Sequence, residues 1–595
     1  MAVVPPLLEI KKNRLCAIAN QMTQTVTRSA YSTVIKERKD VSSSLFDPQR
    51  RLLAEGADVP IHLSMLKPCL QMVFSSYIDV DTLKPGDVVV TNDPYLGPCG
   101  ESVGSHHTND IVTIYPIFVK AVLVGFAAVV AHHRDVGASW SGGHGWNREI
   151  WQEGFRCPPV KLYEAGERND ACMDLILNNT RVPYAMEGDL AAQIAGCRYG
   201  ADEVVHMFER YGQKDMFKAF DELISYSESR TRSEIRRIPP GQYTHEEAVL
   251  DDGAYGGPYA LRVCVHVSDS EIVVDYSGTD RQIEGPINAP WAATYSATHY
   301  AIRCITDPTI PNNDGCAKPV EIDAPMGSLV NCQKPAACHQ RMIVCHTIVD
   351  LIMGALADVI PERVMADSCG CIYCYADAVN TLTHLRGGEV GSGRHTWGEA
   401  VPGGLGARSD ADGMSVMACH VTNVPIPSIE TAETEAPVLY LRREFNPGSA
   451  GPGKFRGGFG QVLAWQTLGE GSSTRFYRAA QKHAIPPQGL FGGKNGRPGC
   501  WTVDEHRTSE EVLATSIGDM KPLENGSTVT LYTVGGGGFG NPLDRQPDLV
   551  RNDVLCELIT LAEARCEYGV VLDTTTMKVD VAKTKALRRR RQRGS

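Results

Sequence analysis

Two histidine-containing segments on either side of a long apolar stretch constrain this chain more than any other feature of its sequence. The first segment reads SHHTND (105–110) and the second reads AHHRD (131–135). Residues 110–118 and 121–133 have the composition of two β-strands, which would bring the segments to adjacent strand ends. Neutral imidazoles and carboxylates that converge from neighbouring loops are typical ligands of Zn, Mn or Fe. The sequence therefore predicts a metal site here.

Each segment contains two consecutive histidines. Neighbouring side chains on a strand point to opposite faces, so we expect each pair to supply one ligand. The other histidine of each pair is then available to orient a ligand or to transfer a proton. His106, His107, His132 and His133 are all candidates, and the residues alone leave open which of each pair binds.

Size, charge and hydropathy limit the class of protein. The 595 residues suffice for about three or four domains. The net charge of −12 argues against a nucleic-acid partner. The longest apolar stretch, residues 121–131, is too short to span a membrane, and the start of the chain lacks a signal-peptide pattern. The 19 cysteines follow no disulfide-scaffold spacing. We therefore expect a cytoplasmic protein with reduced thiols and no membrane partner.

The apolar patterns predict an α+β, multi-domain protein with mixed β-sheets, helical layers and a Gly-rich β region toward the C-terminus. We expect residues 1–240 to form a metal-site domain with a helical cover. Residues 241–450 are expected to form an α+β middle domain, and residues 451–575 a Gly-rich β and helical region. Residues 576–595 are predicted to be a disordered basic tail.

Two other patterns resemble binding sites. The Gly-rich stretch 451–460 contains basic residues, as phosphate-binding loops do, but neither GxxxxGK[ST] nor a strand–GxGxxG–helix unit is present. Tight β turns are the preferred interpretation, and we expect no nucleotide site in this chain. Cys338-His339 and Cys345-His346 resemble ligands, but their apolar surroundings favour core packing.

Eight segments, in order along the chain, resemble the hydantoinase B/5-oxoprolinase family. They are IKERKDVSSSLFD, TNDPYLG, SHHTND, AHHRDVG, EIWQEGFRCPPVKL, GPINAP, GPGKFRGG and GGGGFGNPLDR. The family includes the B subunits of ATP-dependent N-methylhydantoinases and lactamases, and related subunits of acetone and acetophenone carboxylases. Where many relatives have Thr-His-Leu-Pro-Asp, this chain has HHTND, which keeps the ligand spacing and makes its surroundings more polar.

The resemblance implies a metal site made by an Asp after the first helix, a His-x-x-Asp and a later His. On this chain these residues are Asp40, His107, Asp110 and His132, with one divalent transition metal, Zn or Mn, as the cofactor. Three further side chains are candidate catalytic residues that would orient the site or transfer protons: His106, His133 and Asp135. Two more are candidates for substrate or domain contacts: Glu153 and Arg156.

The resemblance also implies a function. A hydantoinase A-type partner subunit would bind ATP and Mg and phosphorylate the amide oxygen of a small cyclic amide. The chain would be the metal-bearing B subunit of this hetero-oligomeric amidase, of the hydantoinase, oxoprolinase or lactamase type. The alternative is a subunit of an ATP-dependent ketone carboxylase, although acetone carboxylase relatives are usually longer. The third hypothesis is a non-catalytic structural subunit. The presence of metal-binding residue types at all four expected ligand positions argues against it.

Overall fold

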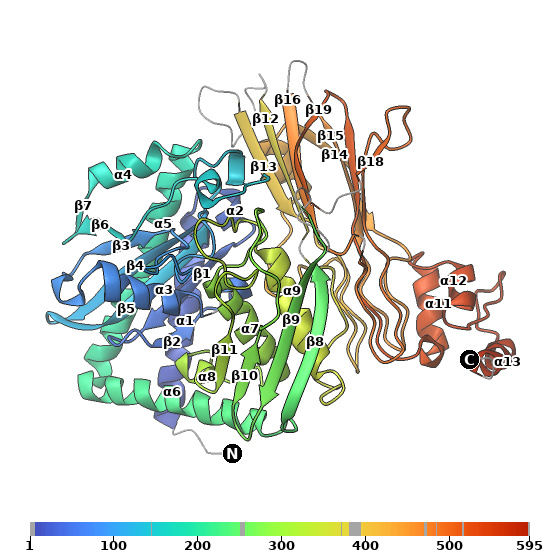
Figure 1. The fold of residues 1–595 in the computed structure, drawn as a ribbon, viewed down its shortest axis with the longest axis horizontal. Helices are drawn as coiled ribbons and strands as arrows, with labels where there is room; N and C mark the ends of the chain where they lie inside the picture. The colour runs from blue at the N-terminus through green and yellow to red at the C-terminus, as the bar shows by residue number, and fades with distance from the viewer. Residues whose placement is uncertain are drawn as a thin grey trace.

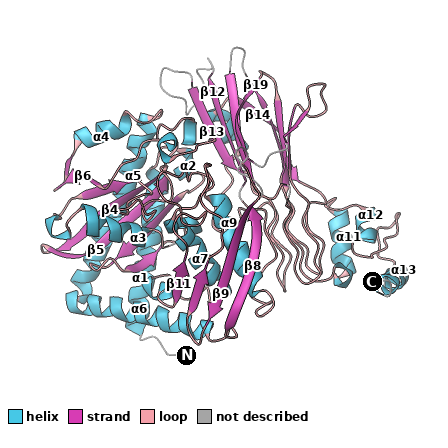
Figure 2. Ribbon diagram, viewed as in Figure 1, coloured by secondary structure: helices cyan, strands magenta, loops and turns pink. Residues whose placement is uncertain are grey.

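The chain folds into four β-sheets, with helices packed on the N-terminal and middle sheets and a small helical lobe that projects at the C-terminal end (Figures 1 and 2). The structure is a computed structural model that describes residues 6–62, 64–143, 145–249, 256–370, 372–379, 394–468, 473–483, 485–513 and 517–592. Within these ranges, no helix combines the length and the apolar character needed to cross a bilayer.

The N-terminal part is built on a seven-stranded antiparallel sheet in the order β2-β1-β5-β4-β3-β6-β7. Its strands are β1 (Val41–Phe46), β2 (Leu52–Glu55), β3 (Val88–Thr91), β4 (Asp110–Val119), β5 (Val122–His132), β6 (Val160–Glu164) and β7 (Glu167–Arg168). One face packs against α1 (Pro6–Ser29), α5 (Pro183–Tyr211) and α6 (Gln213–Ile235). The shorter helices are α2 (Thr33–Lys36), α3 (Leu66–Met72) and α4 (Asp170–Leu177). The opposite face packs against α3.

The pleat of β5 determines which side chains face the prospective metal site. Val129 and Ala131 pack in the core with α1 and α5, whereas Ala128 and Val130 pack on the α3 side. Because the side-chain period of a strand is two residues, His132 continues the row on the α3 side. The histidine that follows it points to the α5 side. The alternation predicted from the sequence thus sets the two neighbouring histidines on opposite faces.

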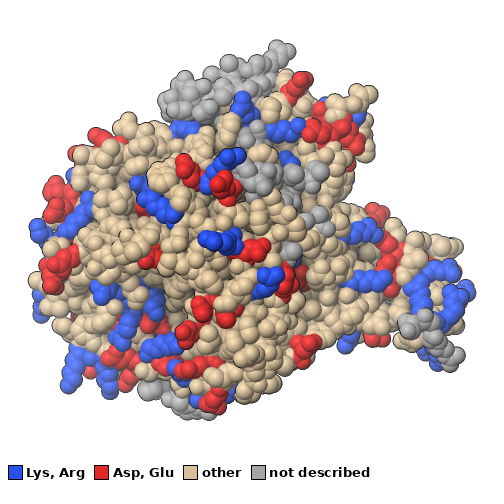
Figure 3. Space-filling model, in the orientation of Figure 1, with Lys and Arg blue, Asp and Glu red and all other residues tan. Residues whose placement is uncertain are grey.

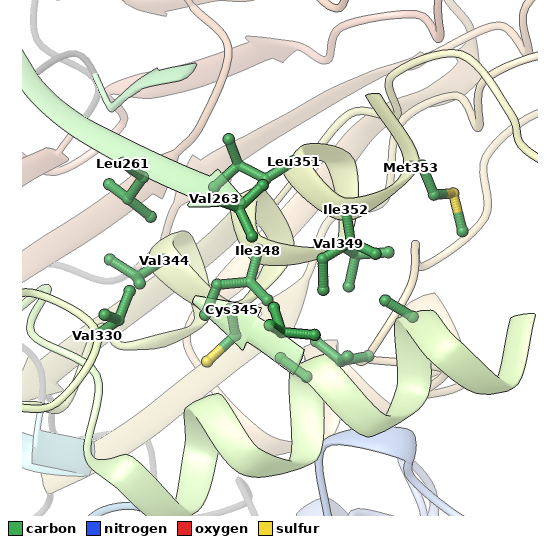
Figure 4. Packing of buried hydrophobic residues seen from close by; sticks show 14 of the residues in the cluster. Leu261, Val263, Val330, Val344, Cys345, Ile348, Val349, Leu351, Ile352 and Met353 are labelled. Carbon is green, nitrogen blue, oxygen red and sulfur yellow. The ribbon is translucent and has the colours of Figure 1, made fainter. Parts of the chain in front are cut away.

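A four-stranded sheet in the order β11-β10-β9-β8 forms the next part of the chain. Its strands are β8 (Gly241–Val249), β9 (Tyr259–Val267), β10 (Ile272–Asp275) and β11 (Val320–Asp323). Its helices are α7 (Trp291–Ile305), α8 (Asp314–Ala317) and α9 (Met342–Leu356). Figure 4 shows Leu261 and Val263 of β9 beside Val344 and Ile348 of α9. The apolar surroundings of Cys345-His346 form α9, a buried helix whose first residue, Met342, lines the candidate metal pocket.

Two further sheets form a sandwich around an aromatic core that includes Trp397, Trp465 and Phe476. One sheet contains β12 (Ile372–Val379), β13 (Arg394–Ala400), β16 (Ser473–Ala480) and β19 (Ile517–Leu523). The other contains β14 (Val438–Phe445), β15 (Gln461–Thr467), β17 (Cys500–Val503), β18 (Glu511–Leu513) and β20 (Thr528–Tyr532). Helix α10 (Ile429–Glu435) precedes β14. Residue 450, where we expected a domain boundary, lies between the paired strands β14 and β15.

The Gly-rich segments pack backbone against backbone beside the sandwich. A Cβ atom at Gly457 would lie 1.9 Å from the carbonyl oxygen of Gly536, and one at Gly404 would lie 1.9 Å from that of Gly458. Only glycine allows the chain to approach another backbone this closely. The glycines therefore permit close packing of three segments that lie far apart in the sequence.

The C-terminal lobe contains α11 (Pro547–Leu555), α12 (Leu561–Cys566) and α13 (Val581–Gln592). The basic tail, which we expected to be disordered, contains α13. The helix is held because the Thr584 hydroxyl accepts a hydrogen bond from the Val571 amide, and Arg588 Nε donates to the Tyr568 carbonyl. These contacts are long-range, and the run of arginines in the sequence does not reveal them. Figure 3 shows basic side chains gathered on this lobe.

Glu55, at the end of β2, connects the first sheet to the α7–α8 region. Its carboxylate accepts hydrogen bonds from the Ser64 amide at 2.8 Å and from the Asn312 side-chain amide. Burial raises the pKa of Glu55 to about 8, so the folded state favours the protonated carboxyl. This contribution to stability is complete below the unfolded-state pKa near 4.5 and is lost as the pH rises through about 8.

We therefore predict that Glu55→Gln reduces the loss of stability between pH 6 and pH 8.5. Glutamine keeps the acceptor for Ser64, and rotation of the Asn312 amide restores the second hydrogen bond. From pH 6 to pH 8.5, the melting temperature of the variant should fall less than that of the wild type, by a difference on the order of 2 °C. Differential scanning calorimetry at both pH values measures it, and parallel pH profiles for the two proteins would contradict the assignment.

Candidate metal centre

Three potential ligand atoms converge where β4 begins and β5 ends. Asp110 and His132 are direct cross-strand partners, and His107 lies in the loop before β4. Asp110 Oδ1 lies 3.0 Å from His107 Nε2 and 3.2 Å from His132 Nδ1. The two ring nitrogens are 3.1 Å apart. The antiparallel register thus builds a compact triangle of two nitrogens and one oxygen.

The triangle has the dimensions that a small divalent cation requires. Ligand bonds of about 2.1 Å separate the ligand atoms by about 3.0 Å at right angles and by about 3.4 Å in a tetrahedron. The observed separations of 3.0, 3.1 and 3.2 Å are within or near this range. Two imidazoles and one carboxylate suit Zn or Mn. The residues present therefore fit such an ion.

The protonation states of these side chains also suit a cation. Burial alone would raise the pKa of Asp110, but His107, His132 and Arg341 together hold it well below its usual range. Burial, with Arg341 as the second cause, lowers the pKa of His107 to about 3. At neutral pH the site therefore offers a carboxylate and a neutral imidazole, which are the forms that bind metal ions.

Two residues just before α9 support the triangle. His339 Nδ1 lies 3.2 Å from His107 Nδ1, and Arg341 Nη2 donates to Asp110 Oδ2 at 3.1 Å. If His107 binds an ion through Nε2, its Nδ1 carries the proton and donates to His339. The contacts therefore fix the ring tautomer of His107 and the orientation of the Asp110 carboxylate.

Glu153 anchors the segment that carries these two residues. Its carboxylate accepts hydrogen bonds from the backbone amides of Cys338, at 3.0 Å, and His339, at 2.8 Å. Burial raises the pKa of Glu153 to about 7, although these hydrogen bonds act in the opposite direction. Arg156, the other residue singled out in this segment, pairs with Asp93 at 3.0 Å instead. Glu153 thus acts on the site by holding the backbone at Cys338 and His339.

A second group shares Asp110 with the triangle. His62 Nε2 and His106 Nδ1 each lie 3.9 Å from Asp110 Oδ2. Arg341 already donates to this oxygen at 3.1 Å, so its guanidinium supplies the positive charge there. Both ring nitrogens of the buried His106 are without a hydrogen-bond partner in the described part of the chain. Oδ1 of the same carboxylate faces His107 Nε2 and His132 Nδ1 instead.

A third acidic group is already neutralised by a lysine. Glu247, Asp350 and Asp367 lie close enough together to bind an ion. Lys482 Nζ lies among them, at 3.3, 3.5 and 2.9 Å respectively. The buried ammonium takes the place that a metal ion would otherwise take, because its charge balances the carboxylates.

Three other candidate residues, Asp40, His133 and Asp135, are not part of the triangle. Asp40 lines the same pocket, and its carbonyl accepts a hydrogen bond from the His132 amide at 3.0 Å. His133 Nε2 lies 2.8 Å from Gln193 Oε1 on α5, on the other face of the sheet. Asp135 binds Arg181, which precedes α5, at 2.8 Å and accepts from the Gly142 amide at 3.2 Å. Neither His133 nor Asp135 lines the pocket.

The pocket at the triangle has a volume of about 40 Å³. Its wall combines the β1–β5–β4 edge with the segments before α9 and after β13. Besides the metal-site residues, it includes Arg38, Ile61, Gln340, Met342, Tyr373 and Thr422. The sequence reasoning did not identify His62 or Arg341 and assigned His339 to the core. The Cys338-His339 pair, which resembles ligands, was the sequence signal for His339.

Arg341 offers a test of the support around the triangle. Arg341→Met leaves Asp110 Oδ2 without its charged donor and frees the carboxylate to rotate. We expect metal affinity to fall about 10- to 100-fold. Arg341→Lys retains the charge but not the planar group that also reaches the His339 carbonyl at 3.2 Å, so it should recover part of the loss. Competition with a chelating indicator measures the affinity, and wild-type affinity in Arg341→Met would remove this role.

Comparison with known proteins agrees with the resemblance found in the sequence. The profile of the hydantoinase B/oxoprolinase family matches residues 5–542. The chain belongs to the hydantoinase B/oxoprolinase family. Within this family, it is 31% identical over 600 residues to a putative D-/L-hydantoinase B-type subunit from Pseudomonas sp. (strain NS671), with 98% of each chain covered.

Two further family comparisons concern caprolactamase of Pseudomonas jessenii. The chain is 29% identical to the beta subunit of that enzyme over 587 residues, which cover 96% of this chain and 97% of that one. The crystal structure of the ATP-dependent caprolactamase has a TM-score of 0.87 at 28% identity, with 99% of this chain and 100% of that chain covered.

An acetone carboxylase structure has a TM-score of 0.89 at 20% identity, with 99% of this chain and 83% of that chain covered, which shows a shared fold.

Proposed function

We propose that this chain is the metal-bearing subunit of an ATP-dependent cyclic amidase. A partner subunit of the hydantoinase A type would bind ATP and Mg and phosphorylate the amide oxygen of the ring. The observation that carries the proposal is the triangle of His107 Nε2, Asp110 Oδ1 and His132 Nδ1, with separations of 3.0 to 3.2 Å, in a chain of this family. Relatives named as hydantoinase and caprolactamase subunits support the substrate class.

In this proposal His107, Asp110 and His132 hold one Zn or Mn ion, and Asp40 completes the ligand set from the pocket wall. Such an ion would supply a bound water of lowered pKa and would polarise the leaving group. Arg341 keeps Asp110 ionised and oriented, and His339 holds the His107 ring. We keep His106 as the candidate for proton transfer, because its Nδ1 lies 3.9 Å from Asp110 Oδ2, whereas His133 and Asp135 bond to Gln193 and Arg181.

The division between subunits follows from the chemistry of amides. An amide carbon is a poor electrophile, and phosphorylation of its oxygen converts that oxygen into a leaving group. Water then adds to the carbon, the C–N bond breaks with a proton transferred to nitrogen, and a second water releases phosphate. The sum is one ring opened and one ATP converted to ADP and phosphate. This chain would position the activated ring and the attacking water.

The proposal is tested by co-expressing the chain with its partner and measuring substrate-stimulated ADP release. The panel contains hydantoin, 2-pyrrolidinone, 5-oxoproline and caprolactam, with acetone and acetophenone as ketones. We expect a cyclic amide to stimulate ADP release and to yield the ring-opened amino acid. Stimulation by a ketone alone, with bicarbonate consumed, would replace the amidase with a carboxylase. The isolated chain should release no ADP with any compound.

A further inference from the structure

A second cavity lies beside the metal pocket and is much larger. Its volume is about 360 Å³, compared with about 40 Å³ for the metal pocket. Pockets that hold small organic ligands usually measure about 300 to 1,000 Å³. The metal pocket has room for a few waters or one amide group, but not for a ring with a substituent. A substituted ring therefore needs additional space.

The two cavities share part of their walls. Val59 and His62 line both of them. His62 Nδ1 lies 3.0 Å from Ser42 Oγ, which faces the second cavity, while its Nε2 lies 3.9 Å from Asp110 Oδ2. The Ile61 amide between them donates to the Val421 carbonyl at 2.9 Å and fixes this wall. The imidazole of His62 thus stands at the boundary between the metal site and the second cavity.

Two charged side chains that line the second cavity, Asp58 and Arg303, already have partners within the chain. Asp58 Oδ2 accepts from Thr23 Oγ1 at 2.7 Å and from the Ser43 amide at 3.1 Å. Arg303 Nη2 donates to the carbonyls of Pro308, at 3.2 Å, and Ile310, at 2.8 Å. These internal bonds satisfy much of the polar character of the wall, and a strongly polar guest would have to compete with them.

Most of the remaining wall is apolar, although Ser42, Glu55 and Asn423 also line the cavity. Val59, Pro60, Pro308 and the ring of Tyr300 line it, together with Cys304 from the last turn of α7. Transfer of an apolar group from water into a cavity with such a wall is favourable by about 25 cal/mol for each Å² of apolar surface removed from water. The cavity therefore suits a hydrocarbon or aromatic group better than a charged one.

We propose that the second cavity binds the apolar ring substituent of the cyclic amide substrate, past His62 from the metal site. This inference rests on the proposed function, because it assumes that the reacting amide lies at the metal pocket. It narrows the substrate class to cyclic amides with an apolar side chain next to the ring. Val59, Tyr300 and Cys304 would then determine specificity by contact with the substituent.

Cys304 provides a direct reporter, because the residue is exposed and lines the cavity. Burial around the thiol raises its pKa, so the labelling is done at alkaline pH. Iodoacetamide labelling of the complex, followed by peptide mass spectrometry, should show that 5-benzylhydantoin slows Cys304 alkylation at least about fivefold and that hydantoin does not. Cys99 and Cys556, which are exposed thiols outside the cavity, should react at constant rates. Equal protection by both hydantoins, or no protection at concentrations that saturate ADP release, would overturn the proposal.

A cavity-filling variant tests the same inference through turnover. Cys304→Trp places a large ring in the cavity from an exposed helical position, and Cys556→Trp is the matched control in the C-terminal lobe. The kcat/KM ratio of 5-benzylhydantoin to hydantoin should fall at least about tenfold in Cys304→Trp, mainly through KM, and stay constant in the control. An unchanged ratio would overturn the inference.

The same pair of measurements is made with 2-pyrrolidinone and 5-benzyl-2-pyrrolidinone if lactams are the ring class that supports turnover. Should Cys304→Trp fail to fold, the labelling of the wild-type complex decides alone. Failure of the proposed function has a different signature, because then no cyclic amide in the panel would stimulate ADP release. If substituted and unsubstituted rings are both turned over but Cys304 is not selectively protected, only the assignment of the second cavity to the ring substituent is contradicted.

Discussion

His132→Ala should lose the bound metal, whereas His133→Ala should keep it. The two residues are adjacent in sequence, but β5 directs His132 to Asp110, at 3.2 Å, and His133 to Gln193, at 2.8 Å. Removing one of three converging ligands leaves too few donors for tight binding. We expect about one ion per chain in the wild type and in His133→Ala, and less than about 0.1 in His132→Ala.

Inductively coupled plasma mass spectrometry of the purified proteins measures the metal content. Both variants remove a buried imidazole, so each serves as a control for general damage to the other, with circular dichroism to confirm folding. Each protein is also dialysed against Zn and Mn to exclude losses during purification. Equal loss of metal from the two variants would refute the assignment of His132.

Asp110→Asn should separate ATP consumption from product formation. The amide keeps the shape of the carboxylate but loses the charge that balances a cation. It also has a single oxygen, whereas Asp110 directs Oδ1 to the two histidines and Oδ2 to Arg341. Ring activation takes place in the partner subunit under our proposal, so ADP release should continue. Product formation should fall at least about 100-fold.

The ratio of ADP to ring-opened product, measured in the same reaction, reports the separation directly. Asp47→Asn is the matched control, because Asp47 is a fully buried carboxylate that bonds Arg51 at 2.6 Å outside the metal pocket. The control should keep the wild-type ratio. A wild-type ratio in Asp110→Asn, with both activities intact, would remove Asp110 from the catalytic account.

The local sequence was sufficient to predict the strands that build the site. The apolar composition of residues 110–118 and 121–133 identified β4 and β5. The shared face of Asp110 and His132 follows from antiparallel pairing, which places them opposite each other. The pleat also separates His132 from His133, as expected for consecutive residues on a strand.

The sequence did not reveal contacts between distant segments. His339 and Arg341 reach the site on a segment whose Cys338 and His339 amides bond Glu153, more than 180 positions earlier. His62 reaches it through a short turn fixed by the Val421 carbonyl. The α13 helix likewise depends on contacts with residues near Tyr568. No local pattern encodes such pairings, because each depends on the arrangement of separate units.

The most direct test of the account compares metal-depleted and metal-reloaded chain in the reconstituted complex. The chain is stripped with a chelator, reloaded with Zn or Mn in a parallel sample, and mixed with the partner subunit, ATP and a cyclic amide. The account predicts ADP release in both samples and ring-opened product only in the reloaded one. Equal amounts of product per ADP in both samples would contradict the claim that this chain contributes an essential metal site to ring opening.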